Sequence, residues 1–384
     1  MKESILDSIV LNRRIIVCVG SGGVGKTTTS AALALRAAHH GRRAIVLTVD
    51  PARRLANALG MASMPNNPVQ VDLAEEVQGS LWALMLDARS TFDEVIRRHA
   101  PSEKARNRIL TNPFYDKATA TLAGTHEYMA MEQLLMLHES DDFDCLILDT
   151  PPSTHAVDFL NAPRRLTAFM NKGTTRIFLK AARAMSSPLS LFALDGVIVK
   201  GISIFVGSGF FRDLLSFIQS FEGMFDSFNH RAEQTQKLLR SDETGFVIVH
   251  VPEPNSVEEA SNFDSLLREE GMNLDAYLAN RVHPPPAFDE ARGWTEIRGT
   301  LDGFKDSREI TDHDIETIEK QGKALLENLK LLSIKDRDAL KKVESIAQSR
   351  NVPAPLIRVP HFDEDLHDIH GLHRFANHAA LSLF

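Results

Sequence analysis

The chain has 384 residues, of which 43% are hydrophobic and 24% are charged. This balance is typical of a folded protein with a large core, and it excludes a fibrous repeat and a long disordered tail. The 51 Asp and Glu side chains outnumber the 43 Lys and Arg, so the net charge is −8. We expect no nucleic-acid partner, because nucleic-acid binding needs clustered basic side chains.

Short apolar runs along the chain predict the strands of a parallel sheet that is buried on both faces. In chain order they cover residues 14–19, 43–49, 144–148, 245–251, 274–280 and 355–360. Helical stretches lie between them, at about 91–138, 166–240 and 300–350. We predict a single α/β domain over residues 1–384, with a mostly parallel sheet flanked by helices and a helical subdomain inserted.

The cysteine content and the absence of targeting patterns narrow the class of protein. Cys18 and Cys145 each lie in a short apolar run, which favours two buried core thiols over a disulfide or a zinc site. We see neither a signal-peptide pattern nor an uncharged apolar stretch long enough to span a membrane. We therefore expect a cytoplasmic protein with no transmembrane segment.

A phosphate-binding loop follows the first predicted strand and precedes a helix. It matches the pattern G-x-x-x-x-G-K-[ST] with Gly20, Ser21, Gly22, Gly23, Val24, Gly25, Lys26 and Thr27. Glycines let backbone N–H groups surround a phosphate, and the helix start adds the positive end of its dipole. Lys26 supplies charge for the β- and γ-phosphates, and the Thr27 hydroxyl is a candidate Mg²⁺ ligand. We predict that this loop and Thr28 bind ATP with Mg²⁺.

An aspartate follows each of two further predicted strands, at Asp50 and Asp149. Such a carboxylate is what a magnesium site or a water-orienting group needs, although a helix cap or a turn also explains either residue alone. With the loop, the motifs D-P-A-x-x-L and D-T-P-P-x-x-H-A-x-D-F-L at these aspartates resemble the ATPase family of arsenite pumps and tail-anchored-protein targeting factors. The resemblance spans nearly the whole chain, is closest to a bacterial branch, and implies the fold of a deviant P-loop NTPase.

The resemblance implies a role for each of several residues. Asp50 corresponds to the catalytic residue that orients or deprotonates the attacking water, with Lys26 on the phosphates. Asp149 corresponds to an aspartate that lies near Mg²⁺, behind its direct ligands. Asn280 corresponds to an adenine-recognising side chain, and Glu253 to a residue near the nucleotide across a dimer. The family binds ATP between two facing subunits, which open and close with hydrolysis.

Ser21 departs from the family pattern, which usually has a lysine at this position that reaches the partner subunit's phosphates. Such a cation is worth on the order of 10³-fold in rate in related NTPases. Our hypothesis is that a lysine-bearing paralogue completes a heterodimer. The alternatives are that Arg53 or Arg54 substitutes, or that the chain is a slow ATPase. The family's zinc and arsenite cysteines are absent, and a single phosphate-binding loop means that two ATP sites require two chains.

Nine of the 21 phenylalanines fall within residues 178–228, and the later ones follow helical spacing. This segment is either a groove for an apolar client helix or the core of a helical subdomain. We interpret the chain as a dimeric ATPase that couples its nucleotide state to a client or partner protein. A low-turnover regulatory nucleotide-binding subunit of a heterodimer and a positioning ATPase are the alternatives.

Overall fold

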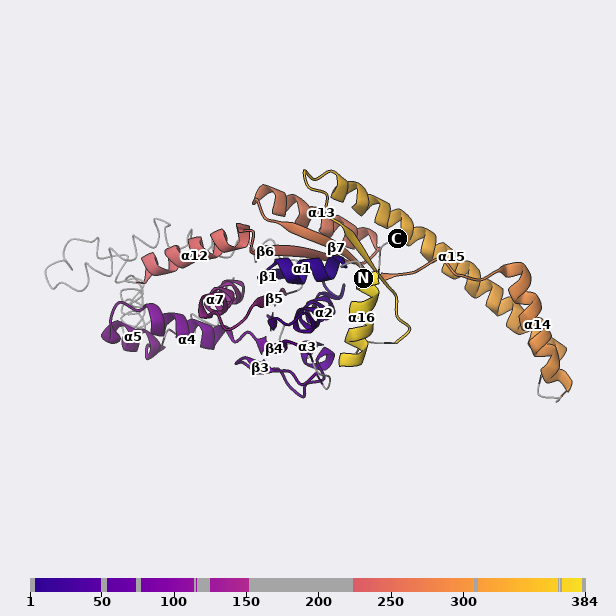
Figure 1. Cartoon of the computed structure of the whole chain (residues 1–384), viewed down its shortest axis with the longest axis horizontal. Helices are drawn as coiled ribbons and strands as arrows, with labels where there is room; N and C mark the ends of the chain where they lie inside the picture. Colours follow the sequence, from indigo (N-terminus) through magenta and orange to yellow (C-terminus); the bar gives the residue numbers. More distant parts are fainter. Residues whose placement is uncertain are drawn as a thin grey trace, which may run out of the picture.

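The computed structural model describes residues 4–49, 54–73, 77–113, 115, 125–151, 224–306, 310–364, 366 and 368–381. Within these residues, one eight-stranded sheet has the order β3-β4-β2-β5-β1-β6-β7-β8 (Figure 1). The strands are β1 (Ile15–Val19), β2 (Arg43–Thr48), β3 (Val69–Gln70), β4 (Ser80–Met85), β5 (Cys145–Asp149), β6 (Thr244–His250), β7 (Leu274–Val282) and β8 (Leu356–Pro360). All neighbours pair in parallel except β3 and β4, so the predicted mostly parallel sheet is confirmed.

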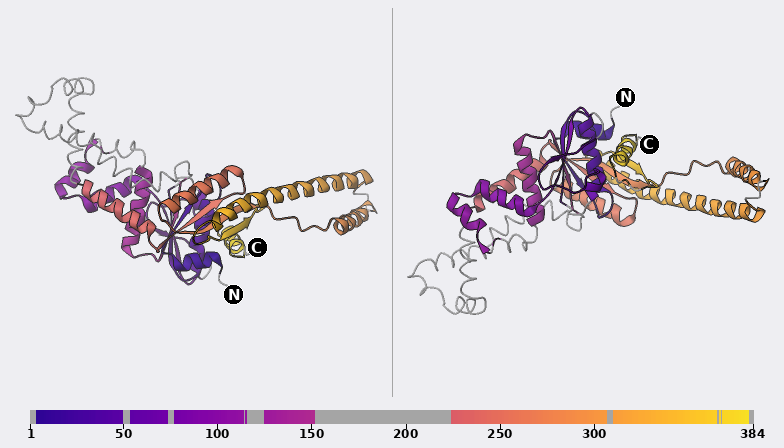
Figure 2. Two further views of the ribbon diagram at one scale, coloured as in Figure 1. Left: turned by 90° about the horizontal axis from the view of Figure 1, so that it is seen from above. Right: turned by 90° about the horizontal axis from the view of Figure 1, so that it is seen from below.

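Helices cover both faces of the sheet (Figures 1 and 2). Their bounds are α1 (Ile5–Asn12), α2 (Lys26–His39), α3 (Arg54–Ala58), α4 (Ala88–His99), α5 (Glu103–Leu110), α7 (Thr125–Ser140), α12 (Phe225–Arg240), α13 (Pro254–Glu269), α14 (Glu290–Asp306), α15 (Asp312–Gln348) and α16 (Ile369–Leu381). One layer contains α1, α2, α3 and α16, and the other contains α4, α5, α7, α12, α13 and one end of α15. This arrangement confirms the predicted α/β class.

The central strands are apolar throughout because both of their faces are covered. Ile15, Val17 and Val19 of β1 pack into the layer that contains α7 and α13. Ile16 and Cys18 alternate with them and pack into the layer that contains α2. All five side chains are fully buried. A continuous apolar run of this kind is the sequence signature of a central parallel strand.

The strand order brings three polar strand ends to one edge of the sheet. β5 lies between β1 and β2, and Asp149 is paired in register with Cys18 on one side and Thr48 on the other. The residues that follow β1 form the phosphate-binding loop, and α2 begins directly after it at Lys26. Parallel strands end at the same edge, where ligands bind in open α/β sheets.

The sequence-based expectation does not include the strands β3 and β4, nor several of the helices. The run from Ser80 to Met85 forms β4, although its Leu, Ala and Met residues favour helix. Pairing with β2 overrides that local preference. The helix α1 was also not expected; it begins at a capping box formed by Ser4 and Asp7. Of the stretch predicted at 166–240, residues 166–223 lie outside the described residues, and α12 occupies its end.

A long helical hairpin extends from the sheet (Figure 2). In it α14 lies along the outer part of α15, where the Lys323 ammonium lies 5.5 Å from the centroid of the Trp294 ring. At the base of the hairpin, Asp336 of α15 accepts hydrogen bonds from the His283 backbone N–H at 2.7 Å and from its ring at 2.9 Å. Across the described ranges, no helix is both long enough and apolar enough to cross a membrane.

Candidate nucleotide site

The phosphate-binding loop follows a path that only glycine permits at two points. A Cβ atom on Gly20 would lie 2.0 Å from the Val249 carbonyl oxygen of β6. A Cβ atom on Gly25 would lie 2.2 Å from Nδ2 of Asn280, and Gly25 has a φ of +100°. The loop is therefore packed between the ends of β6 and β7, with no room for side chains at these positions.

Lys26 is folded over the loop that precedes it. Its Nζ donates to the Gly20 carbonyl at 2.9 Å and to the Ser21 carbonyl at 2.7 Å. The residue is only 6% exposed, so its charge acts in a partly desolvated place. Because electrostatic attraction is stronger away from water, this ammonium would attract a phosphate group at the loop strongly.

Two hydroxyl groups converge on one carboxylate oxygen beside the loop. Asp149 Oδ2 accepts hydrogen bonds from Thr27 Oγ1 at 2.8 Å and from Thr48 Oγ1 at 3.0 Å. Asp149 and Thr48 are each 1% exposed. Hydroxyl and carboxylate oxygens are the ligand atoms that Mg²⁺ prefers, so this group of side chains fits the predicted metal. Thr28 follows in the first turn of α2 and is half-buried.

Ser21 contacts a neutral partner in this structure. Its hydroxyl lies 3.1 Å from the hydroxyl of Ser256, in the first turn of α13. The Ser256 oxygen also accepts a hydrogen bond from the Val251 N–H at 3.1 Å. Glu253 is exposed and occupies the N-cap position of the same helix, where its side chain makes no capping hydrogen bond. Ser21 and Glu253 thus lie at the same edge of the sheet, near the start of α13.

Asn280 is placed against the loop backbone. Its Nδ2 donates to the Val24 carbonyl at 2.9 Å, and its Oδ1 accepts from the Arg281 N–H at 2.9 Å. Asp50, the predicted water-orienting residue, lies outside the described residues, as does Arg53. The described part of the predicted site therefore gathers the loop, Thr27, Asp149 and Asn280, with Glu253 at the rim.

Two residues of this site were missed from the sequence. Thr48 is a polar residue near the end of an apolar strand, and that pattern could have indicated it. Ser256 has no sequence signal, because an isolated serine in the first turn of a helix is common. Both residues contact predicted site residues through hydroxyl groups, Thr48 through Asp149 and Ser256 through Ser21.

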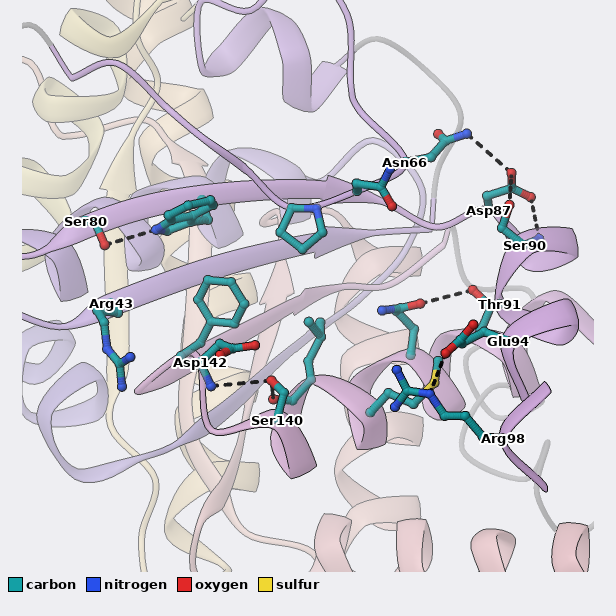
Figure 3. A pocket seen from close by; sticks show the side chains of 17 residues that line it. Arg43, Asn66, Ser80, Asp87, Ser90, Thr91, Glu94, Arg98, Ser140 and Asp142 are labelled. Atoms are coloured by element: carbon teal, nitrogen blue, oxygen red, sulfur yellow. Dashed lines mark hydrogen bonds and ion pairs between the residues drawn. The ribbon is translucent and has the colours of Figure 1, made fainter. Parts of the chain in front are cut away.

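A separate pocket of about 760 Å³ lies along β4, between α4 and α7. Arg43 and Asp142 lie at one end and Glu94 and Arg98 at the other, as Figure 3 shows. The aromatic rings of Trp82 and Phe143, with centroids 5.8 Å apart, contribute to its wall. None of the residues predicted for the nucleotide site lines this pocket, so it is distinct from that site.

Comparison with known proteins agrees with this geometry. The profile of the anion-transporting ATPase family matches residues 13–299. ATPase GET3 of Malassezia globosa is 25% identical over 285 residues, which cover 74% of this chain and 77% of that protein. ATPase GET3C of Arabidopsis thaliana is 24% identical over 298 residues, 73% of this chain and 70% of that protein. The family profile spans most of the chain and includes its phosphate-binding loop, Asp149 and Asn280. The chain therefore belongs to the anion-transporting ATPase family, which confirms the predicted resemblance and the prediction of a P-loop ATPase.

Proposed function

We propose that this ATPase works as a dimer that couples its nucleotide state to the binding of a client or partner protein. The observation that supports an active nucleotide site best is the contact between Thr27 and Asp149, since Thr27 directly follows the buried Lys26 in the chain. Lys26 and Thr27 come from the start of α2 and Asp149 comes from the end of β5, yet they meet at one edge of the sheet. Dimer formation and client coupling rest on the family resemblance.

The proposed reaction is in-line attack of water on the γ-phosphorus of ATP, which breaks its bond to the oxygen that bridges the β- and γ-phosphates and releases ADP and phosphate. Lys26 and the backbone N–H groups of residues 22–28 hold the phosphates, Thr27 would ligate Mg²⁺, and Asp149 would lie behind the direct ligands of the ion. When bound, this ion neutralises charge on the phosphate oxygens. Asp50 orients the attacking water and accepts its proton. Thr48 holds the Asp149 carboxylate from the opposite side to Thr27.

The assignment of Lys26 and Asp50 is tested with one variant of each residue. Lys26→Ala should abolish nucleotide binding, because it removes the charge on the phosphates. Asp50→Asn should retain ATP binding, measured by calorimetry, and lose steady-state hydrolysis. Lys320→Ala, on the exposed surface of α15, is the matched control and should change neither quantity. Unchanged hydrolysis in Asp50→Asn would contradict its role.

Ser21 raises a question about the dimer, because a symmetric homodimer would present a neutral hydroxyl to both phosphate sites. We propose that a lysine-bearing paralogue supplies the missing cation in a heterodimer. The same neutral contact with Ser256 favours one alternative, a regulatory subunit with low turnover. In that case the chain binds ATP and its partner while hydrolysing little ATP itself.

The heterodimer proposal is tested by purification from the native cell, native mass measurement and an ATPase assay with and without the copurifying chain. We expect the partner to raise kcat on the order of 10³-fold, because a cation that stabilises the transition state gives a rate gain of this size in related enzymes. A second test measures ATP hydrolysis by Ser21→Lys, which restores a cation at this position, with Ser21→Met as the uncharged control of similar length. Equal hydrolysis by the isolated chain and by every pair tested would contradict the heterodimer.

The client groove proposed for residues 178–228 is described only at its end. Phe228 is 2% exposed, and its ring stacks on Phe92 with centroids 5.9 Å apart. Phe225 also packs against this core. These two phenylalanines support the interpretation of a subdomain core. The other seven lie outside the described residues, so the groove stays a proposal for them.

A further inference from the structure

Asn280 connects the end of β7 to the phosphate-binding loop, 256 positions earlier in the chain. The backbone N–H of Arg281 is a donor, so the Asn280 side-chain atom that faces it is the accepting oxygen, Oδ1. The amide nitrogen Nδ2 therefore faces the Val24 carbonyl, to which it donates. Asn280 is 7% exposed. A buried amide held by backbone groups at both ends has one orientation, and it fixes the two backbone segments relative to each other.

The loop is shaped to receive this side chain. Gly25 lies so close to Asn280 that a Cβ atom would be 2.2 Å from Nδ2. Gly25 is also the N-cap residue of α2, with left-handed backbone geometry. The close approach therefore occurs where the loop turns into the helix that carries Lys26.

The hydrogen bond to Val24 also sets the direction of a neighbouring donor. The peptide group that joins Val24 to Gly25 is planar and trans, so the Gly25 N–H points opposite to the Val24 carbonyl. Because the carbonyl is directed at Asn280, the N–H is directed away from it. The Gly25 N–H is one of the groups that a loop of this type offers to a phosphate.

We infer that Asn280 is a positioning residue that holds the phosphate-binding loop in its anion-binding shape, and so contributes to binding of the triphosphate itself. This inference rests on the proposed nucleotide site. This role differs from recognition of the base alone, because a side chain that contacts only the base would not affect the binding of a ligand that has no base.

The test compares ATP, GTP and inorganic tripolyphosphate as ligands in calorimetric titrations of the full chain. Asn280→Leu keeps the size of the side chain, adds no charge, and leaves the Val24 carbonyl without its donor. We expect tripolyphosphate affinity to fall roughly tenfold, as for the loss of a buried hydrogen bond. Unchanged tripolyphosphate affinity, with loss confined to ATP or to the ATP-to-GTP preference, would overturn the inference.

Asn273→Leu is the matched control. Asn273 also donates from its side chain to backbone carbonyls, at 3.0 Å to Ser241 and 3.4 Å to Thr244, but it lies at the opposite end of β7. It should lower stability without changing tripolyphosphate affinity. If Asn280→Leu does not fold, Asn280→Ser gives the same comparison with a smaller side chain. A wild-type chain that binds neither ATP nor tripolyphosphate would refute the proposed nucleotide site instead.

A double-variant cycle provides an independent measurement. Gly25→Ala should weaken tripolyphosphate binding because its Cβ meets Asn280, and part of that loss should disappear in the Asn280→Ser background. Gly23→Ala is the control for backbone strain, since Gly23 has a φ of +77° and, apart from its chain neighbours, no described residue has an atom within 4 Å of an added Cβ. Its effect should be the same in both backgrounds. An equal loss for Gly25→Ala in both backgrounds would count against the contact with Asn280.

Discussion

His250 is a fully buried ring at the end of β6, the strand that lines the phosphate-binding loop. It is 0% exposed, and its ring meets that of Tyr277 edge-on with centroids 6.5 Å apart. Burial lowers the pKa of His250 from 6.5 to about 4, because the charged imidazolium would lose its hydration. The ring is therefore neutral in the folded protein at neutral pH.

We predict that this histidine makes folding stability depend on pH. The folded pKa is lower than the unfolded pKa, so the unfolded chain binds the proton first as pH falls. The contribution of the neutral His250 ring to folding stability is fully present well above pH 6.5. It is lost as the pH falls from about 6.5 to about 4, and the loss is about 3 kcal/mol at most. Urea unfolding at pH 7.5 and pH 5 measures the loss, and His250→Phe should reduce it.

His313→Gln is the control for the His250 prediction. His313 is exposed near the start of α15, so its replacement should leave the pH dependence as it is in the wild type. If His250→Phe and wild type lose the same stability between the two pH values, His250 is not the source of the dependence.

At the scale of elements, a buried ion pair joins α7 to α12. Arg231 Nε lies 2.6 Å from Glu132 Oε2, and their side chains are 5% and 0% exposed. The Tyr128 hydroxyl donates to the same carboxylate, and Glu139 lies 3.4 Å from Arg231. α7 leads into β5, the strand that ends at Asp149, so this pair connects α12 to the helix that precedes that strand in the chain.

We predict that Arg231→Met destabilises the fold by about 3–5 kcal/mol, because it leaves the Glu132 carboxylate buried without its cation. The double variant Glu132→Leu with Arg231→Met should recover much of that loss, since neither charge is then buried. Denaturant unfolding gives both values. Glu296→Gln breaks an exposed pair with Arg292 on α14 and should cause no measurable change. A double variant less stable than Arg231→Met would contradict this account.

At the scale of the whole molecule, the hairpin of α14 and α15 is a part of the described chain that extends well beyond the sheet (Figure 2). Only the C-terminal part of α15 contributes to the core, through Val343 and Ala347. The outer part exposes several apolar side chains, among them Leu325 at 61% and Leu331 at 55%. The hairpin lies between β7 and β8 in the chain, so it is an excursion between two neighbouring strands of the sheet.

We predict that the outer hairpin can be removed without loss of the nucleotide site. Glu290 and Lys330 form an ion pair between the two helices, so the chain can be closed there by a short glycine linker in place of residues 291–329. The His283 contact with Asp336 at the hairpin base is retained. ATP affinity should stay within about twofold of wild type, because distant sites act independently. Loss of folding or of ATP binding in this variant would show that the hairpin supports the domain.

Much of the fold could be predicted because its signals are local. The six predicted strands are apolar runs, and the layer arrangement follows from their burial on both faces. β4 could not be predicted in this way, because its residues favour helix and only pairing with β2 makes them a strand. The ion-pair partners of Arg231 could not be predicted either, because they lie on α7 and no sequence pattern links that helix to Arg231.

The phosphate-binding loop was determined by the sequence itself, because consecutive residues contain both the glycines and the charge that the chemistry needs. The tertiary structure alone decided what surrounds that loop. It paired Ser21 with Ser256, Thr48 with Asp149, and Asn280 with the Val24 carbonyl. These contacts join residues from separate strands and helices, and they exist only because the parallel sheet brings its strand ends to one edge.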